Sequence, residues 1–176
     1  MTQILMLGDS LVEWGDWQSL LPEVSVINKG RAGEYLPELS YRLAGELEEQ
    51  PQRDAILLQS GTNDLLSGNY AFPAIYTSML PRLRLLEEEN PIILCSLAPM
   101  PIIPLPRLKA VNKELADLAA TVENCHFLDL VPPFTKKCLP ITHPGFLNDQ
   151  VHLSTRGYQV WAEEIRQCLK QLGLSG

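Results

Sequence analysis

Five short apolar segments alternate along the chain with longer segments of helical periodicity. The apolar segments are Ile4–Leu7, Val24–Ile27, Ala55–Leu58, Ile92–Leu97 and Phe127–Leu130. None of them alternates strictly between apolar and polar residues, which is typical of strands covered on both faces of a parallel sheet. We therefore predict an α/β protein with five parallel strands in a three-layer α/β/α sandwich.

Four helices are predicted from apolar residues spaced three and four apart. They lie around Leu36–Leu47, Ile75–Leu86, Leu108–Val122 and Tyr158–Leu172. Pro81 falls inside the second helix and predicts a kink or a split, because proline removes a main-chain hydrogen bond and costs about 3 kcal/mol in a helix interior. Ser154 is the predicted N-cap of the last helix, and Gly173 its predicted end.

Two connections are rich in proline and are predicted to be irregular loops. The first, 98–106, is strongly apolar, and we expect its Met100, Ile102 and Ile103 to be exposed. The second, 131–148, holds four prolines. Loops of this length in a compact domain are often functional. No internal repeat or low-complexity tract divides the chain, so residues 1–176 are predicted to form a single domain.

Composition is ordinary for a soluble globular protein. The chain has 176 residues, of which 45% are hydrophobic and 20% charged, and its net charge is −7. This acidity argues against a nucleic-acid partner. No segment has the length of a transmembrane span and the N-terminus lacks the features of a secretory signal, so we expect a cytoplasmic location. We expect the protein to be a monomer or a homodimer.

Cysteine spacing predicts neither a metal site nor a cofactor. The four cysteines are Cys95, Cys125, Cys138 and Cys168. They form no C-x-x-C pair and have no histidine at metal-ligand spacing. We expect buried free thiols, as is usual in a reducing compartment.

A serine stands directly after the first predicted strand. Ser10 lies in the string Gly-Asp-Ser-Leu at positions 8–11. A turn at this point exposes the hydroxyl and directs the main-chain N–H of Ser10 toward the same place. We assign Asp9 to the architecture of the turn. An alternative reading is purely structural, because aspartate and serine after a strand are common turn and N-cap residues.

An aspartate precedes a histidine by three residues near the end of the chain. In a tight turn Asp149 can accept the Nδ1–H of His152 and leave Nε2 free to take a proton. A surface aspartate beside a histidine that precedes a helix is the alternative. His143 is a rival base, although no acidic residue precedes it by three. His126 opens a predicted strand and is more easily read as structural.

Two further residues are candidate donors to a developing oxyanion. Asn63 follows Gly61 after the third strand and carries a side-chain amide, whereas an Asn-Asp turn is the alternative. Gly33 ends an N-x-G-x-x-G string that begins at Asn28. A glycine there lets the main-chain N–H approach a substrate, or simply permits a positive φ. The string lacks the third glycine of a dinucleotide-binding fingerprint.

The candidates are predicted to meet at one edge of the sheet. Ser10, Gly33 and Asn63 each follow a strand by a few residues, and ligands of parallel sheets bind outside the carboxyl ends of the strands. Together with Asp149 and His152 they supply a nucleophile, oxyanion donors, a base and an orienting group. This is the set of groups that acyl transfer by a serine requires.

These strings resemble the four sequence blocks of the SGNH hydrolases, the GDSL family of esterases and lipases. The resemblance runs from Ser10 to the helix after His152. It places the nucleophile on Ser10, the oxyanion hole on Ser10, Gly33 and Asn63, and the rest of the triad on Asp149 and His152. It implies a flavodoxin-like five-stranded sheet, hydrolysis of esters or thioesters, and no metal or cofactor.

The substrate subgroup is less closely defined. The Gly-Thr-Asn-Asp string and the ending His152–Tyr158 are similar to those of platelet-activating-factor acetylhydrolases and carbohydrate acetylesterases. Gly61–Thr62 replaces the frequent Gly-Gly, however, and Glu34 replaces the common aspartate after Gly33. We favour short acyl esters, chiefly acetyl esters, because the chain is small and has no obvious lid insertion.

Candidates for contact with the substrate are Leu11, Trp14, Met100 and Ile102, and packing in the core explains these residues equally well. Three alternatives remain beside a short-acyl esterase. One is a lysophospholipase or thioesterase that prefers longer acyl groups. Another is a non-catalytic flavodoxin-like module that binds an anion at Ser60–Asn63. The third is a catalytically silent relative that serves as an interaction surface.

Overall fold

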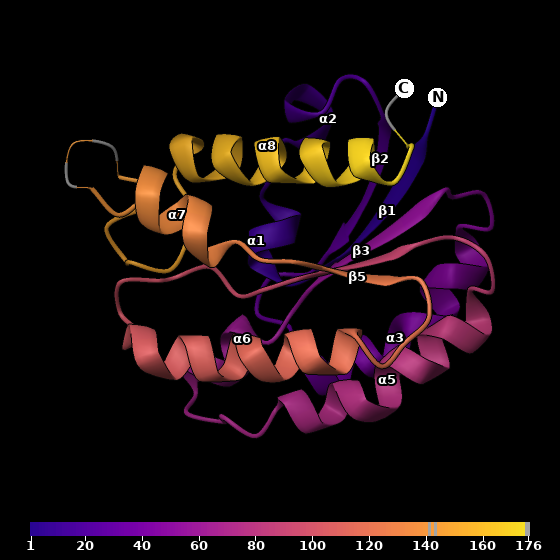
Figure 1. The fold of residues 1–176 in the computed structure, drawn as a ribbon, viewed down its shortest axis with the longest axis horizontal. Helices are drawn as coiled ribbons and strands as arrows, with labels where there is room; N and C mark the ends of the chain where they lie inside the picture. The colour runs from indigo at the N-terminus through magenta and orange to yellow at the C-terminus, as the bar shows by residue number, and fades with distance from the viewer. Residues whose placement is uncertain (141, 143, 175–176) are drawn as a thin grey trace.

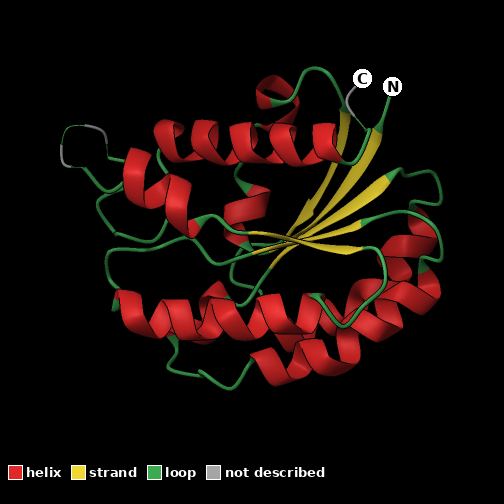
Figure 2. Cartoon of the chain, viewed as in Figure 1, coloured by secondary structure: helices red, strands yellow, loops and turns green. Residues whose placement is uncertain are grey.

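A single five-stranded parallel sheet forms the centre of the molecule. The computed structural model describes residues 1–140, 142 and 144–174. The strands are β1 (Gln3–Gly8), β2 (Ser25–Gly30), β3 (Ala55–Gln59), β4 (Ile92–Cys95) and β5 (Cys125–Leu128). They lie in the order β2-β1-β3-β4-β5, and each neighbouring pair is parallel. This is the flavodoxin-like order, so the predicted fold class is confirmed. Figure 2 shows the sheet between two groups of helices.

Helices cover both faces of the sheet. They are α1 (Ser10–Glu13), α2 (Trp17–Leu20), α3 (Leu36–Glu49), α4 (Thr62–Leu66), α5 (Pro73–Leu86), α6 (Leu105–Ala119), α7 (Val131–Lys137) and α8 (Thr155–Gln171). In Figure 1, α3, α5 and α6 lie below the sheet, and α2, α7 and α8 lie above it. None of the helices in the described part of the chain is long and apolar enough to cross a membrane.

Burial explains why the strands do not alternate between apolar and polar residues. The apolar residues of β1, β3 and β4 are almost completely buried, because helices cover both faces of these inner strands. The two edge strands, β2 and β5, are only partly buried. A continuous apolar run therefore marks the inner strands of this sheet.

The carboxyl ends of three strands lie level with one another. Gly8 at the end of β1 is in register with Gly30 of β2 and with Gln59 of β3. A Cβ atom on Gly8 would stand 2.1 Å from the carbonyl oxygen of Gln59, so only glycine fits at this point. The sheet order reverses between β1 and β3, and this is where ligands bind in open α/β sheets.

The sequence predicted a kink or a split at Pro81 and an irregular loop at 131–148. Helix α5 runs through Pro81, so the predicted split does not occur. Helix α7 forms inside the segment predicted to be a loop, because Pro132 and Pro133 fall in its first turn, where no main-chain N–H is needed.

The predicted ends of α8 are confirmed. Ser154 accepts a hydrogen bond from the N–H of Gly157, and Gly173 adopts a φ of +73°.

Candidate active site

Ser10, His152 and Asp149 form one chain of hydrogen bonds. The Oγ of Ser10 lies 3.1 Å from Nε2 of His152, and Nδ1 of the same ring lies 2.6 Å from Oδ2 of Asp149. The sequence separates Ser10 from His152 by 142 residues. The fold thus brings a hydroxyl, an imidazole and a carboxylate into line at the carboxyl edge of the sheet.

The turn after β1 holds Ser10 in place. Ser10 is the first residue of α1, and Asp9 caps this helix by accepting the N–H of Leu11 on Oδ1 at 3.0 Å. The Asp9 side chain is completely buried. Its burial raises the pKa of the carboxyl to about 6, although hydrogen bonds from Leu11 and Thr62 partly oppose this rise. The assignment of Asp9 to the turn agrees with this geometry.

A tight turn fixes Asp149 against His152. Oδ1 of Asp149 accepts the main-chain N–H groups of Val151 and His152, each at 3.0 Å. The hydrogen bond from the His152 side chain, helped by these N–H groups, lowers the pKa of Asp149 to about 2. The carboxylate is therefore ionised near neutral pH and acts only as an acceptor. Nδ1 of His152 must then carry the proton, and in the neutral ring Nε2 can accept one from Ser10.

Two tryptophans join the segment around Ser10 to the segment around His152. The indole of Trp14 is 53% exposed and stacks on the imidazole of His152. Trp17 is buried and meets the ring of Trp161 on α8 edge to face, with centroids 4.9 Å apart. Its Nε1 also donates to the carbonyl of Val12 on α1 at 2.7 Å. The short helices after β1 are thereby attached to α8.

Gly33 and Asn63 lie beside each other, linked through Glu34. Nδ2 of Asn63 donates one hydrogen to the carbonyl of Glu34 at 2.8 Å, which leaves its second N–H available. Gly33 has a φ of +78° in the turn that the N–H of Glu34 closes onto the carbonyl of Arg31. Among the described residues, no main-chain carbonyl outside the helices and strands accepts the N–H of Ser10 or of Gly33. These two N–H groups and the second Nδ2 hydrogen of Asn63 are therefore candidate donors to a ligand.

The remaining candidates from the sequence differ in whether they are buried or exposed. Leu11 and Met100 are each 1% exposed and pack in the hydrophobic core, so the expected exposure of Met100 is wrong. Ile102 is 53% exposed, as expected. His126 lies in β5, and its Nε2 pairs with the Oδ1 of Asn124. The rival base His143 lies outside the described residues.

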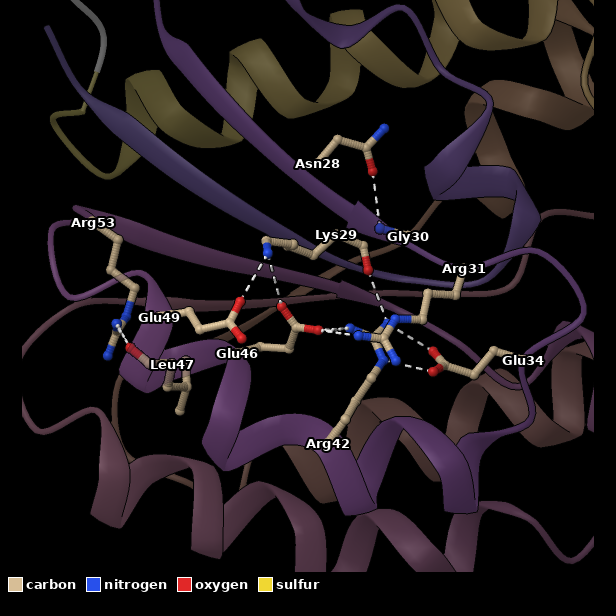
Figure 3. A network of polar contacts seen from close by, with 10 residues as sticks. All are labelled: Asn28, Lys29, Gly30, Arg31, Glu34, Arg42, Glu46, Leu47, Glu49 and Arg53. Carbon is tan, nitrogen blue, oxygen red and sulfur yellow. Dashed lines mark hydrogen bonds and ion pairs between the residues drawn. The ribbon is translucent and has the colours of Figure 1, made fainter.

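A network of charged side chains behind Gly33 was not predicted. The guanidinium of Arg42 contacts both Glu34 and Glu46, and the network extends to Lys29 and Arg31 (Figure 3). Arg42 and Glu46 lie on α3 one helical turn apart. Glu46 falls within the apolar stripe of this helix, and that position is the signal in the sequence.

Comparison with solved structures supports the same fold. The lipase/acylhydrolase of Enterococcus faecalis shares 22% identity with a TM-score of 0.78, over 98% of this chain and 97% of that one. A carbohydrate esterase of family 3 from Talaromyces cellulolyticus shares 19% identity with a TM-score of 0.80, over 98% of both chains. An acetyl esterase mutant with an acetate ion has 19% identity and a TM-score of 0.79, also over 98% of both chains.

Sequence comparison identifies the family. No curated protein sequence matches the chain. The sequence model of the GDSL-like lipase/acylhydrolase family matches residues 6–160, which include the segments that hold Ser10 and His152. This chain therefore belongs to the GDSL-like lipase/acylhydrolase family and is an ester-hydrolysing enzyme.

Proposed function

We propose that this enzyme hydrolyses short-acyl carboxylic esters, chiefly acetyl esters, through an acyl-enzyme on Ser10. The observation that carries the proposal is the hydrogen-bonded chain from Ser10 through His152 to Asp149. Nε2 of His152 removes the proton from Ser10 Oγ as this oxygen attacks the ester carbonyl. Asp149 accepts the Nδ1–H and stabilises the imidazolium that forms.

The tetrahedral intermediate is stabilised by the available donors. The main-chain N–H groups of Ser10 and Gly33 and the side-chain amide of Asn63 bind the oxyanion. His152 then gives its proton to the departing alcohol. Water repeats the sequence in the second half-reaction, which releases the acid and restores the Ser10 hydroxyl. No step requires a metal or a cofactor.

Two kinds of observation bear on the length of the acyl group. The solved neighbours include an acetyl esterase and carbohydrate esterases of family 3, which supports an acetyl substrate. The exposed apolar side chains Trp14, Ile102 and Leu147, together with a shallow pocket lined by Pro101, Phe146 and Leu147, favour the second candidate, a lysophospholipase or thioesterase with longer acyl groups.

Labelling by a fluorophosphonate probe tests the chemistry, because only an activated serine reacts with this probe. We expect one label, on Ser10, and none on the Ser10→Ala variant, which should unfold at the same temperature as the parent. Turnover by Ser10→Ala at the parent rate would end the proposal. Nitrophenyl acetate, butyrate, octanoate and dodecanoate then separate the two candidates. We expect the highest kcat/KM for acetate, and a preference for octanoate or dodecanoate would favour the second.

A further inference from the structure

Arg42 makes a two-pronged contact with the carboxylate of Glu34. Its Nε lies 2.5 Å from Oε1 and its Nη2 lies 2.8 Å from Oε2, as Figure 3 shows. Both side chains are buried, with 9% of Arg42 and 6% of Glu34 exposed. This bidentate geometry fixes the direction as well as the distance of the carboxylate.

The main chain of Glu34 contacts the Asn63 amide and closes the turn that contains Gly33. Its carbonyl accepts the amide of Asn63 at 2.8 Å. Its N–H closes the turn in which Gly33 takes a positive φ, by donating to the carbonyl of Arg31 at 3.2 Å. A shift of this one residue would displace the Asn63 amide and the Gly33 N–H together.

Arg42 also makes contacts besides the one with Glu34. Nη2 donates to the carbonyl of Lys29 in β2 at 2.8 Å, and Nη1 pairs with Oε1 of Glu46 at 3.0 Å. The Glu46 carboxylate also contacts the side chains of Lys29 and Arg31. The guanidinium is thus fixed to strand β2 and to helix α3, and it transfers that rigidity to Glu34.

We propose that Arg42 is a positioning residue of this enzyme, which acts through the Glu34 carboxylate to hold the Asn63 amide and the Gly33 N–H in the geometry that binds the oxyanion. The inference rests on the proposed function, because it assigns the oxyanion to these donors. Breaking a buried ion pair also destabilises a fold, so the melting temperature is measured beside kcat to separate positioning from folding.

The chain offers a matched control in a second buried arginine–glutamate pair. Nε of Arg53 lies 2.5 Å from Oε2 of Glu87, and the two side chains are 8% and 7% exposed. Arg53 also donates to the main-chain carbonyl of Leu47. Arg53 precedes β3 and therefore lies at the amino edge of the sheet, opposite the edge that carries Ser10.

The test compares Arg42→Lys with Arg53→Lys, since lysine keeps the charge but cannot form the two-pronged contact. We measure kcat and KM for nitrophenyl acetate, the melting temperature, and the fraction of Ser10 labelled by a fluorophosphonate. We expect kcat of Arg42→Lys to fall roughly 10- to 100-fold with little change in KM, less than the 10²–10³-fold fall on removing an oxyanion donor. Arg53→Lys should lower the melting temperature but keep kcat of the folded enzyme within about two-fold, because its pair is far from the donors.

A double-mutant cycle separates positioning from general damage. In an Asn63→Ala background, Arg42→Lys should lower kcat much less than it does in the parent, because one of the groups it positions is already absent. If Arg42→Lys fails to fold, Glu34→Gln tests the same contact without a change in side-chain size.

Three results would overturn the proposal: an unchanged kcat in Arg42→Lys or Glu34→Gln, an equal fall in Arg53→Lys, or fully additive effects with Asn63→Ala. Absence of the label from the parent enzyme would count against the proposed function instead, so the two failures are distinguishable.

Discussion

The indole of Trp14 stacks on the imidazole of His152, with ring centroids 4.2 Å apart and planes inclined by 28°. Trp14 belongs to the same segment as Ser10, so the stack holds the proposed base over the proposed nucleophile. The imidazole is restrained on its edge by the hydrogen bond to Asp149 and on its face by Trp14. This contact was not predicted from the sequence. The stack places Trp14 against the proposed base, whereas the sequence suggested it only as a residue that contacts the substrate.

Replacing Trp14 tests this restraint. Trp14→Ala is expected to lower kcat roughly two- to ten-fold, because a stacked aromatic pair contributes about 0.5–1.5 kcal/mol. Trp14→Phe keeps a ring over His152 and should retain most of the activity. Steady-state kinetics on nitrophenyl acetate measure both variants. An alanine variant as active as the parent would show that the hydrogen bond to Asp149 orients the ring unaided.

Removing the charge of Asp149 should impair the chemistry more than the fold. Asp149→Asn is expected to lower kcat by roughly 10³–10⁴-fold, because an amide cannot stabilise the imidazolium and favours the wrong tautomer. Since the pKa of Asp149 is about 2, this group remains ionised above about pH 4 and should cause no change in parent activity there. A pH–rate profile above that value checks this, and a fall in activity attributable to Asp149 near pH 4 would contradict it.

The buried carboxyl of Asp9 should make stability depend on pH. Its pKa is raised from 3.8 to about 6 in the folded protein, so the native state holds this proton more tightly than the unfolded state. Stability from this group is present at acidic pH, falls as pH rises from about 4 to about 6, and stays low above that. The side chain of Asp9→Asn cannot ionise. At neutral pH the free energy of unfolding of this variant should therefore exceed that of the parent by up to about 3 kcal/mol. Denaturant unfolding at about pH 4 and about pH 8 measures the difference, and a gap that does not change with pH would refute it.

Replacing Trp17 should reduce the stability of the fold, whereas replacing Trp14 should mainly reduce the turnover rate. Trp17 is 2% exposed between α1 and α8, so Trp17→Ala is expected to lose about 3–5 kcal/mol of unfolding free energy. Trp14→Ala serves as the control, because half of that indole is already exposed to solvent. Circular dichroism during denaturant unfolding compares them. Equal losses in the two variants would show that Trp17 does not connect α1 to α8.

Local strings made much of the fold and the central residues of the site predictable. Ser10 follows a continuous apolar run, and Asp149 lies within one turn of His152, so each could be found from its own neighbourhood. The role that we propose for Arg42 could not be found in this way, because it acts through Glu34 on Asn63, which is 29 residues beyond Glu34 along the chain. Helix α7 was missed because a pair of prolines usually indicates a loop. The pair is compatible with a helix here only because both prolines fall in its first turn. Met100 was misplaced because proline spacing shows where a chain is irregular but not which side chains turn inward.

Strand β1 precedes the other four strands along the chain yet occupies an inner place in the sheet, and His152 follows Ser10 by 142 residues. On the proposed mechanism, the Ser10 hydroxyl has no imidazole to activate it until the segment that carries His152 is in place. The proposed activity therefore requires two segments far apart in the sequence to be folded against each other. The release of a coloured alcohol can thus report, on ribosomes or during refolding, the moment at which the two distant halves come together.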